Sequence, residues 1–308
     1  MSENCEMLKE LINDPKILVA PGVYDGFSAR LVSKMGFKAA VVTGAGLSES
    51  RLGYPDVGLM GFETNLEACR AMASCVKDLP LLADGDTGYG NAINVFFVVR
   101  AFEDAGLAGI MIEDQAWPKR CGHLAGKEVI SSDEMVKKVK AAVDARRNPN
   151  FIIKARTDAA GVLGIEEAIN RANLYAEAGA DIVHPDAVLS VDDIRNFVNH
   201  VDIPVAINMG FGIRTRSTTP LVSAAELEEM KVATVEYPRL ITASAIQGMI
   251  NALSVLEESI KLGKVIERQD LLVSFEELSS LMGLEEIHRL EKLYLTETQL
   301  DVKYKRKN

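Results

Sequence analysis

The chain has 308 residues, 48% of them hydrophobic, and a formal net charge of -10 from 34 Lys and Arg against 44 Asp and Glu. This length supplies one large domain or two small ones. The acidic balance argues against a nucleic-acid partner, because neutralising phosphates requires a basic face. An anionic small molecule remains compatible, since a few local arginines and a metal ion can reverse the charge inside a pocket.

The first residues and the cysteines of the chain bear on the cellular compartment that we expect for the protein. Residues 1–5 are acidic and lack the basic start and apolar centre of a signal peptide. No apolar run approaches the roughly 18 residues that span a bilayer, so we expect no membrane contact. The four cysteines, Cys5, Cys69, Cys75 and Cys121, show no CxxC pairing. We therefore expect a cytoplasmic enzyme with reduced thiols.

Short β-branched runs recur along the chain, each followed by polar or glycine residues and a helical pattern. They are residues 17–20, 39–42, 81–84, 109–112, 151–154, 181–183, 205–207 and 232–235. Near-continuous apolar strands indicate burial on both faces and hence a parallel sheet. Capping-box patterns at 131–134 and 223–226 begin helices, and Gly106 and Gly179 end them. Eight strand–helix units predict an α/β fold of the (β/α)8 TIM-barrel type.

From about residue 241 onward the pattern is helical, with no further strand signal. This extension is too apolar to stand alone, so we expect it to pack on the barrel or on a neighbouring subunit. No linker or low-complexity segment separates it. We predict a single domain, 1–308, with the barrel at about 15–240 and barrel-closing and C-terminal helices at 241–308.

Polar residues fall at or just beyond the C-terminal ends of the predicted strands. They are Thr43, Asp84, Glu113, Arg156, His184, Asp186 and Asn208. In a (β/α)8 barrel that rim holds the active site. The alternative is that these are only solvated loop ends, but such ends would not so consistently supply carboxylates, an arginine and an amide.

Four carboxylates predict a divalent metal site. Asp84 and Asp86 follow the third strand, and Asp56 and Glu113 join them at the rim without counter-charges of their own. Crowded carboxylates repel unless a cation compensates, and Mg²⁺ suits the case because it takes few carboxylates and retains waters. Taken singly, each Asp is more often a helix cap or loop residue.

Two further side chains indicate chemistry. Cys121 lies in the run 119–123, Lys-Arg-Cys-Gly-His, where neighbouring cations favour the thiolate. Arg156 ends the fifth strand, and its planar fork suits a substrate carboxylate, although a salt bridge to Asp158 or Glu113 is the structural alternative. His123 either binds a substrate carboxylate or orders its loop.

Four stretches, 82–90, 113–115, 118–123 and 155–159, carry a resemblance to a known family. Residues from about 15 to 250 resemble the isocitrate lyase/phosphoenolpyruvate mutase superfamily. Within it, the chain looks most similar to the branch of methylisocitrate lyase, 2,3-dimethylmalate lyase and oxaloacetate hydrolase. The Cys-bearing stretch distinguishes this branch from phosphonate mutases and phosphonopyruvate hydrolases, which lack the cysteine there.

The resemblance implies a barrel whose last helix is exchanged between subunits, usually in a dimer of dimers. It implies Mg²⁺, or alternatively Mn²⁺, near Asp56, Asp84, Asp86 and Glu113, and a lid with Cys121 that closes over a small carboxylate substrate. The candidate catalytic residues are Cys121, Arg156 and Glu113. The candidate substrate-binding residues are Thr43, Gly44, Ala45, Asp84, Gly122, His123, Arg156, Asp186, Asn208 and Thr219.

The chain departs from the family pattern at three places. Val41 stands where several relatives have a tyrosine that is a candidate base, and Asp186 is shorter than the usual glutamate. The loop 208–220 is longer and more cationic than in relatives. Its Arg214 and Arg216 either bind an extra anionic group or are solvated. These departures bear on the identity of the substrate more than on the reaction class.

The sequence favours a Mg²⁺-dependent carbon–carbon lyase acting on a 2-hydroxy di- or tricarboxylate. The alternative is an oxaloacetate hydrolase that gives oxalate and acetate. A carboxyphosphonoenolpyruvate-type phosphonomutase is less favoured, and a non-catalytic metal-binding barrel least of all, because Asp84, Asp86, Glu113, Cys121 and Arg156 are all present.

Overall fold

The computed structural model describes residues 2–210 and 218–304. Its described residues form eight parallel strands in the order β6-β5-β4-β3-β2-β1-β8-β7. An isolated parallel bridge between Val183 and Val205 joins β6 to β7 and closes the barrel. The strands are β1 (Leu18–Val23), β2 (Ala40–Val42), β3 (Leu81–Asp84), β4 (Gly109–Glu113), β5 (Ile152–Thr157), β6 (Ile182–Pro185), β7 (Ala206–Asn208) and β8 (Thr234–Tyr237). The predicted TIM-type barrel is confirmed, and its eighth strand lies two residues later than predicted.

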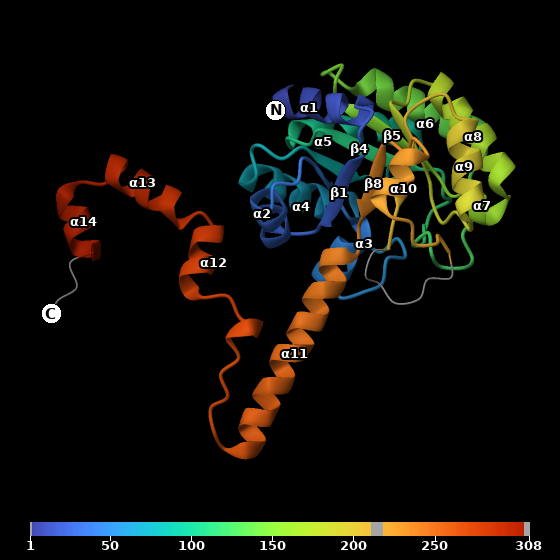
Figure 1. The fold of residues 1–308 in the computed structure, drawn as a ribbon. Helices are drawn as coiled ribbons and strands as arrows, with labels where there is room; N and C mark the ends of the chain where they lie inside the picture. The colour runs from blue at the N-terminus through green and yellow to red at the C-terminus, as the bar shows by residue number, and fades with distance from the viewer. Residues whose placement is uncertain (1, 211–217, 305–308) are drawn as a thin grey trace. The chain divides into compact units, whose positions relative to one another are not determined.

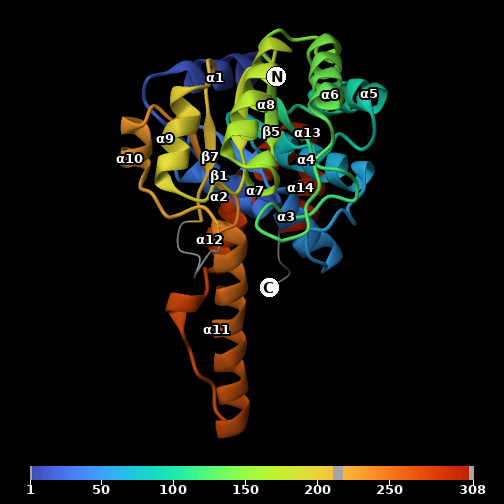
Figure 2. The ribbon, with the colours of Figure 1, turned by 90° about the vertical axis from the view of Figure 1, so that its right-hand side faces the viewer.

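Helices surround the strands (Figures 1 and 2). In the barrel they are α1 (Ser2–Asn13), α2 (Gly26–Lys34), α3 (Gly44–Leu47), the π-helical η1 (Ser48–Leu52), α4 (Phe62–Cys75), α5 (Ala92–Asp104), α6 (Ser132–Ala145), α7 (Ala159–Val162), α8 (Ile165–Glu177), α9 (Val191–Asn199) and α10 (Ala224–Glu229). Of the two predicted capping boxes, one is complete and the other shows the N-cap half. Ser223 and Glu226 form the reciprocal box before α10, and Ser131 accepts from the Glu134 amide at the start of α6. Gly106 and Gly179 take the left-handed conformation that ends α5 and α8.

The strand register brings the polar residues to one rim. Glu113 on β4 pairs with Arg156 on β5, and Arg156 pairs in turn with His184 on β6. On the other side, Asn208 of β7 pairs with Glu236 of β8. Because all strands run in the same direction, their C-terminal ends meet at the same end of the barrel. Register alone therefore gathers these side chains.

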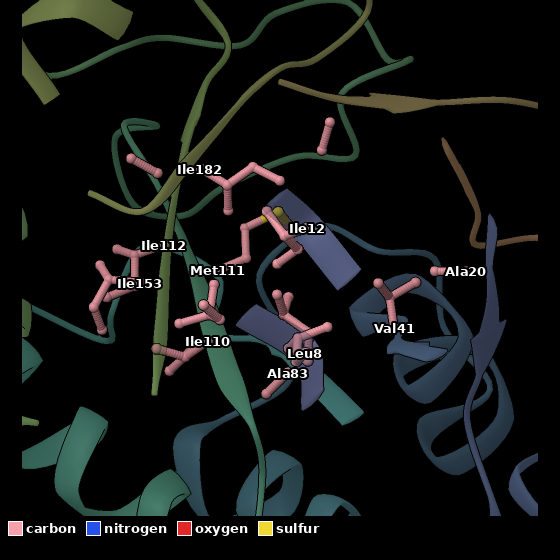
Figure 3. Packing of buried hydrophobic residues seen from close by; sticks show 14 of the residues in the cluster. Leu8, Ile12, Ala20, Val41, Ala83, Ile110, Met111, Ile112, Ile153 and Ile182 are labelled. Atoms are coloured by element: carbon pink, nitrogen blue, oxygen red, sulfur yellow. The ribbon is translucent and has the colours of Figure 1, made fainter. Parts of the chain in front are cut away.

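The opposite end of the barrel is closed by α1. Its Leu8 and Ile12 line a small internal cavity together with strand residues that include Leu18, Ala40 and Ile182. Figure 3 shows Leu8 and Ile12 among the buried side chains of the strands. Burial of such apolar side chains contributes about 25 cal/mol per Å². The interior of the barrel below the rim is therefore filled by packed apolar side chains.

Contacts divide the chain into two compact units, residues 1–244 and 245–308. The C-terminal part is helical, as predicted: α11 (Leu240–Leu262), the 3-10 helix η2 (Gln269–Leu271), α12 (Phe275–Leu281), α13 (Leu284–Tyr294) and α14 (Glu297–Tyr304). The boundary between the units lies close to the predicted end of the barrel. The single-domain organisation remains a prediction.

Helix α11 is the most apolar long helix of the C-terminal part. Its 23 residues are long and apolar enough, by length and composition, to cross a membrane, although we expected no such run. The sequence has no uninterrupted apolar run of that length, because this helix intersperses its apolar residues with polar and charged ones, among them Glu257 and Lys261. Its exposed Ile246, Met249, Leu253, Leu256 and Ile260 follow one another at alternating steps of three and four residues. This spacing is typical of a seam that packs against another helix.

Candidate active site

Most of the candidate residues line one cavity at the C-terminal rim of the barrel. They are Thr43, Ala45, Asp56, Asp84, Cys121, Gly122, His123, Arg156, Asp186 and Asn208. Asp86 and Glu113 are buried and lie next to residues of this lining, as their contacts below show. Gly44 contacts Asp84 through its amide. Thr219 is buried but is not among the lining residues.

Backbone amides fix the pair of aspartates after β3. The Gly44 amide donates to Asp84 Oδ2 and the Asp86 amide to Asp84 Oδ1, both at 3.1 Å. Asp86 has a φ of 47°, a left-handed conformation that Asp tolerates better than most residues. The chain therefore turns immediately after Asp84. This turn lets the side chains of Asp84 and Asp86 face the same region, although one residue separates them.

Lys119 supplies a counter-charge that the sequence analysis missed. Its Nζ lies 2.5 Å from Asp56 Oδ1 and 2.7 Å from Asp86 Oδ1, and all three side chains are buried. Burial raises the pKa of Asp86 to about 6, although Lys119 acts in the opposite direction. The statement that the four acids have no counter-charges of their own was wrong. Lys119 lies 33 or more residues from both aspartates in the sequence, so only the folded chain brings it to them.

Arg156 lies among three carboxylates. Its Nε is 3.2 Å from Glu113 Oε2 and 2.8 Å from Asp158 Oδ2, and its Nη2 is 2.7 Å from Asp186 Oδ2. Burial raises the pKa of Glu113 well above its usual value, whereas Arg156 outweighs burial at Asp186 and holds that pKa well below it. The salt bridges considered as the structural alternative are thus present. Arg156 also lines the cavity, so they do not exclude contact with a substrate.

A second layer orients this cluster through Asp114. Its buried carboxylate accepts hydrogen bonds from Thr157 Oγ1 at 2.8 Å and from the Asp158 amide at 2.9 Å. Tyr175 Oη donates to it at 2.8 Å, and Arg171 Nη1 at 3.0 Å. Asp114 therefore fixes the segment that presents Asp158 to Arg156. The sequence alone did not reveal this network, because its members are scattered over 62 positions.

The loop 117–127 lies over the cavity and is hereafter called the lid. The Cys121 amide donates to the Asp56 carbonyl at 2.9 Å. Lys127 Nζ donates to the Gly122 carbonyl at 2.6 Å and to Asp158 Oδ1 at 3.0 Å. These contacts tie the lid to both the aspartate side and the arginine side of the rim.

Gly122 lies close against the carboxylate and the guanidinium of the barrel rim. A Cβ added there would lie 1.4 Å from Asp186 Oδ2 and 2.8 Å from Arg156 Nη2. Next to it, His123 Nδ1 lies 2.6 Å from Thr218 Oγ1. This contact supports the role of His123 in ordering its loop, and the residue also lines the cavity. Only a glycine at position 122 lets the lid take this position.

Four further charged residues, which the sequence analysis overlooked, belong to the site. Arg239 contacts both Cys121 and Glu49, and it follows β8 directly after the strand-end proline. Lys154 Nζ lies 2.5 Å from Glu236 Oε1 in the barrel interior, and both residues line the cavity. A charged residue inside an apolar strand is a signal that could have indicated Lys154 and Glu236. Arg239 and Glu49 had no such signal.

The chemistry of the acids fits a hard divalent cation. Glu113 Oε1 and Asn208 Oδ1 are buried without a hydrogen-bond partner among the described residues. Such oxygens suit a ligand, because an unpaired buried acceptor costs roughly 1–3 kcal/mol. Within residues 2–210 and 218–304, however, no group of three or more His, Cys, Asp or Glu side chains is arranged around a common metal position. The donors suit Mg²⁺, and Lys119 provides the positive charge between Asp56 and Asp86.

Arg214 and Arg216, which were predicted to bind an extra anionic group or to be solvated, lie outside the described residues. The ends of their loop are described. Asn208 opens it with an amide oxygen at the cavity, and Thr218 contacts the lid.

A parallel barrel with carboxylates, an arginine and a lid at its C-terminal rim defines the class of TIM-barrel enzymes. Residues 8–256 match the family described as phosphoenolpyruvate phosphomutase. The chain belongs to the phosphoenolpyruvate mutase/isocitrate lyase superfamily, as its sequence motifs had indicated. Its enzyme relatives imply a small-molecule carboxylate substrate.

Individual relatives are similar over nearly their whole length. The chain is 40% identical to 2,3-dimethylmalate lyase of Eubacterium barkeri, covering 94% of this chain and 97% of the relative. It is 41% identical to 2-methylisocitrate lyase of Aeropyrum pernix, covering 90% and 86%. The structure of oxaloacetate acetylhydrolase with 3,3-difluorooxalacetate matches with a TM-score of 0.86 at 31% identity, covering 94% and 97%. A phosphonopyruvate hydrolase solved with oxalate and Mg²⁺ matches with a TM-score of 0.80 at 29% identity, covering 95% and 99%.

Proposed function

We propose that this protein is a Mg²⁺-dependent carbon–carbon lyase that cleaves a 2-hydroxy di- or tricarboxylate of the alkylmalate or methylisocitrate type. The main support is that Cys121, Arg156 and Asp84 line one cavity under a lid that Gly122 allows to close. The similarity to 2,3-dimethylmalate lyase and 2-methylisocitrate lyase over most of the chain supports the same reaction class.

Asp84, Asp86, Asp56 and Glu113 would hold the Mg²⁺, with Mn²⁺ as the alternative ion. When bound, the ion would polarise substrate oxygens and stabilise negative charge that develops on them. Because Lys119 already neutralises Asp56 and Asp86, an incoming ion competes with its ammonium group. Mg²⁺ beside oxalate in a phosphonopyruvate hydrolase supports the choice of metal.

The protein's own side chains would orient the substrate and move the proton. Arg156 would bind the carboxylate of the 2-hydroxy acid, and the unpaired amide oxygen of Asn208 would accept from its hydroxyl group. The backbone of Thr43, Gly44 and Ala45 would border the same end. Cleavage of the bond between the second and third carbons would turn the C2 hydroxyl into a carbonyl and release the hydroxyl proton to a carboxylate of the site, for which Glu113 with its unpaired Oε1 is the candidate. The electron pair of the broken bond stays on the departing third carbon. Cys121 would donate its thiol proton there, a role that general acids fill at a gain of about 10²–10⁴-fold.

The lid would exclude water while the carbanion exists. Gly122 and His123 would reach the substrate from above, and Asp186 would stay on Arg156 and hold its fork in place. Thr219 would support the lid from below, next to the contact between Thr218 and His123.

The second candidate function is oxaloacetate hydrolysis to oxalate and acetate. The structural match to oxaloacetate acetylhydrolase at a TM-score of 0.86 favours it. A panel of 2,3-dimethylmalate, methylisocitrate, oxaloacetate and a carboxyphosphono acid, with Mg²⁺ and products identified by mass spectrometry, separates the candidates. A 2-oxo acid formed from a 2-hydroxy acid supports the lyase, and oxalate formed only from oxaloacetate supports the hydrolase. Turnover of the phosphono acid alone, or of nothing, would favour the phosphonomutase or the non-catalytic barrel and overturn the lyase.

Inhibition by oxalate is a second test, because its planar carboxylates imitate an enolate-like intermediate. Strong competitive inhibition that requires Mg²⁺ is expected. Equal inhibition after treatment with EDTA would contradict the assignment of Asp84 and Asp86 to the metal.

We also propose a cytoplasmic homo-oligomer, a dimer of dimers, in which the C-terminal helices pass between subunits and touch no membrane. The seam of Ile246, Met249, Leu253, Leu256 and Ile260 on α11 supports this, because those side chains are exposed within the described chain. Light scattering during size-exclusion chromatography is expected to give four times the 33.5 kDa chain mass. A monomer would contradict the assembly, and partitioning into detergent would favour a membrane role for α11.

A further inference from the structure

Lys154 and Glu236, hereafter the floor pair, form an ion pair at the bottom of the candidate active-site cavity. Lys154 Nζ lies 2.5 Å from Glu236 Oε1, and the two side chains are 0% and 8% exposed. Lys154 stands two residues before Arg156 on β5, so both side chains are on the same face of the strand and Lys154 lies deeper in the barrel. Both members of the pair line the active-site cavity and also the small cavity closed by α1. The floor pair therefore separates the site from the apolar interior below it.

The floor pair has hydrogen-bonding capacity that no described residue uses. An ammonium group carries three N–H donors. Among the described residues, however, Glu236 Oε1 is the only hydrogen-bond partner of Lys154 Nζ, and Glu236 Oε2 accepts no hydrogen bond. Arg156, which lines the same cavity, contacts three carboxylates. Because an unpaired buried polar group is costly, the free donors and the free acceptor of the floor pair suit a polar group of a ligand.

We propose that Lys154 and Glu236 determine substrate specificity by binding a hydroxyl group on the substituent that the 2-hydroxy acid carries at its third carbon. The hydroxyl oxygen accepts from Lys154 Nζ, and the hydroxyl proton is donated to Glu236 Oε2. A hydroxyl group is both donor and acceptor, so it complements both members of the pair. An alkyl group leaves them unpaired, and a carboxylate meets the like charge of Glu236. This inference rests on the proposed function, because it assumes a 2-hydroxy acid in the cavity.

The strand register explains why the third carbon is the relevant position. In the proposed function, Arg156 and Asn208 bind the carboxylate and the hydroxyl group at the second-carbon end of the substrate. Lys154 lies about 6.6 Å below Arg156 along β5, the rise of two strand residues. Glu236 is the register partner of Asn208 across β7 and β8. A substituent on the neighbouring third carbon that is directed into the barrel therefore meets the floor pair.

Malates with different substituents on the third carbon test this preference. Binding to the full-length protein with Mg²⁺ is measured by calorimetry, and kcat/KM is measured for any malate that is cleaved. A hydroxymethyl and an ethyl substituent have nearly the same size and differ in the hydroxyl group. We expect the hydroxymethyl compound to bind about tenfold or more tightly, because a site with buried polar groups rejects a ligand that leaves them unpaired. Isocitrate, which is malate with a carboxymethyl substituent, should bind less tightly than the hydroxymethyl compound.

A double variant tests the residues themselves. Lys154→Met with Glu236→Leu replaces the floor pair by apolar side chains of similar size, a change that is often neutral or stabilising for a buried ion pair. This variant should bind the ethyl compound at least as tightly as the hydroxymethyl compound. Arg146→Met with Asp181→Leu is the matched control, because this pair also has an N–O distance of 2.5 Å but is not among the described residues that line the cavity. The control is expected to keep the preference of the wild type.

Each outcome decides the proposal. Equal binding of the hydroxymethyl and ethyl compounds by the wild type, or tighter binding of isocitrate, overturns it. A preference that survives in the floor-pair variant, or is lost equally in the control, overturns it as well. If the floor-pair variant does not fold, the comparison of the three ligands in the wild type decides alone. Failure of every malate to bind refutes the proposed function together with this inference, whereas binding without discrimination refutes only this inference.

Discussion

Replacing Gly122 by alanine tests whether the lid must close for activity. The new methyl group would meet Asp186 Oδ2 at 1.4 Å and Asp186 Cγ at 2.6 Å, both closer than real Cβ contacts. The φ of Gly122 is not in the left-handed region, so only space forbids the side chain. The lid must then move away and give up its contacts.

The contacts of the lid give the size of the expected loss in kcat/KM. A displaced lid loses the hydrogen bond from the Cys121 amide to the Asp56 carbonyl, the one from Lys127 to the Gly122 carbonyl, and the contact between His123 and Thr218. At about 1 kcal/mol for each net hydrogen bond, the closed lid is disfavoured by about 3 kcal/mol. Since 1.36 kcal/mol corresponds to a factor of ten, kcat/KM is expected to fall about 100-fold.

Two assays and one control complete the test. We expect trypsin to cleave the lid of Gly122→Ala several times faster than that of the wild type. Because the three lost hydrogen bonds amount to about 3 kcal/mol while the barrel itself is untouched, we expect Tm to fall by about 5 °C. Gly161→Ala is the control, since its Cβ would meet the Lys127 side chain at Nζ, 3.6 Å, and Cε, 3.9 Å, both ordinary contacts. A Gly122→Ala enzyme with kcat/KM within threefold of the wild type would refute the argument.

Three further predictions address other parts of the site. Cys121→Ser should keep the fold and Mg²⁺ binding, measured by calorimetry, but lose about 10²-fold or more in turnover; near-wild-type turnover would exclude the proposed proton donor. Asp114→Asn should destabilise the protein by about 3–5 kcal/mol, because it breaks a buried pair with Arg171, and lower Tm by about 6 °C; an unchanged urea midpoint would contradict this. Arg156 lowers the pKa of Asp158 and Asp186, although burial acts to raise both values. The two carboxylates therefore stabilise the folded protein fully above their unfolded pKa of about 3.9. This stabilisation is lost as the pH falls through the lower pKa of the folded state. In Arg156→Met, burial should raise both pKa values instead, so the urea midpoint should increase from pH 8 to pH 6; a midpoint that decreases over this range would contradict the argument.

The barrel was predictable from the sequence because its signals are local. Each strand is a short apolar run, and caps such as Ser223 with Glu226 mark helix starts within four residues. The eighth strand was displaced by two residues because Val232 and Ala233 continue the apolar run before the hydrogen-bonded ladder begins at Thr234. The apolar seam of α11 could be recognised only after the structure showed which of its side chains are exposed, and the sequence alone does not give that exposure.

The site was predictable only where its residues stand at strand ends. Four residues could be placed at the rim because each stands at the end of a strand that the apolar runs predict: Asp84, Glu113, Arg156 and Asn208. The residues that contact these four could not be predicted. The approach of Lys119 to Asp86 and of Arg239 to Cys121 depends on how the lid lies. These contacts join residues 33 and 118 positions apart, and no local pattern encodes them.

The helix α1 has a practical consequence for work on this enzyme. Because Leu8 and Ile12 close the barrel at the end opposite the candidate active site, an affinity tag or fluorophore joined to the start of α1 is expected to lie far from a ligand bound there. Deleting this helix would expose Leu18 and Ala40 to solvent at the end of the barrel. Because exposed apolar surface promotes aggregation, a truncated protein is expected to precipitate more readily.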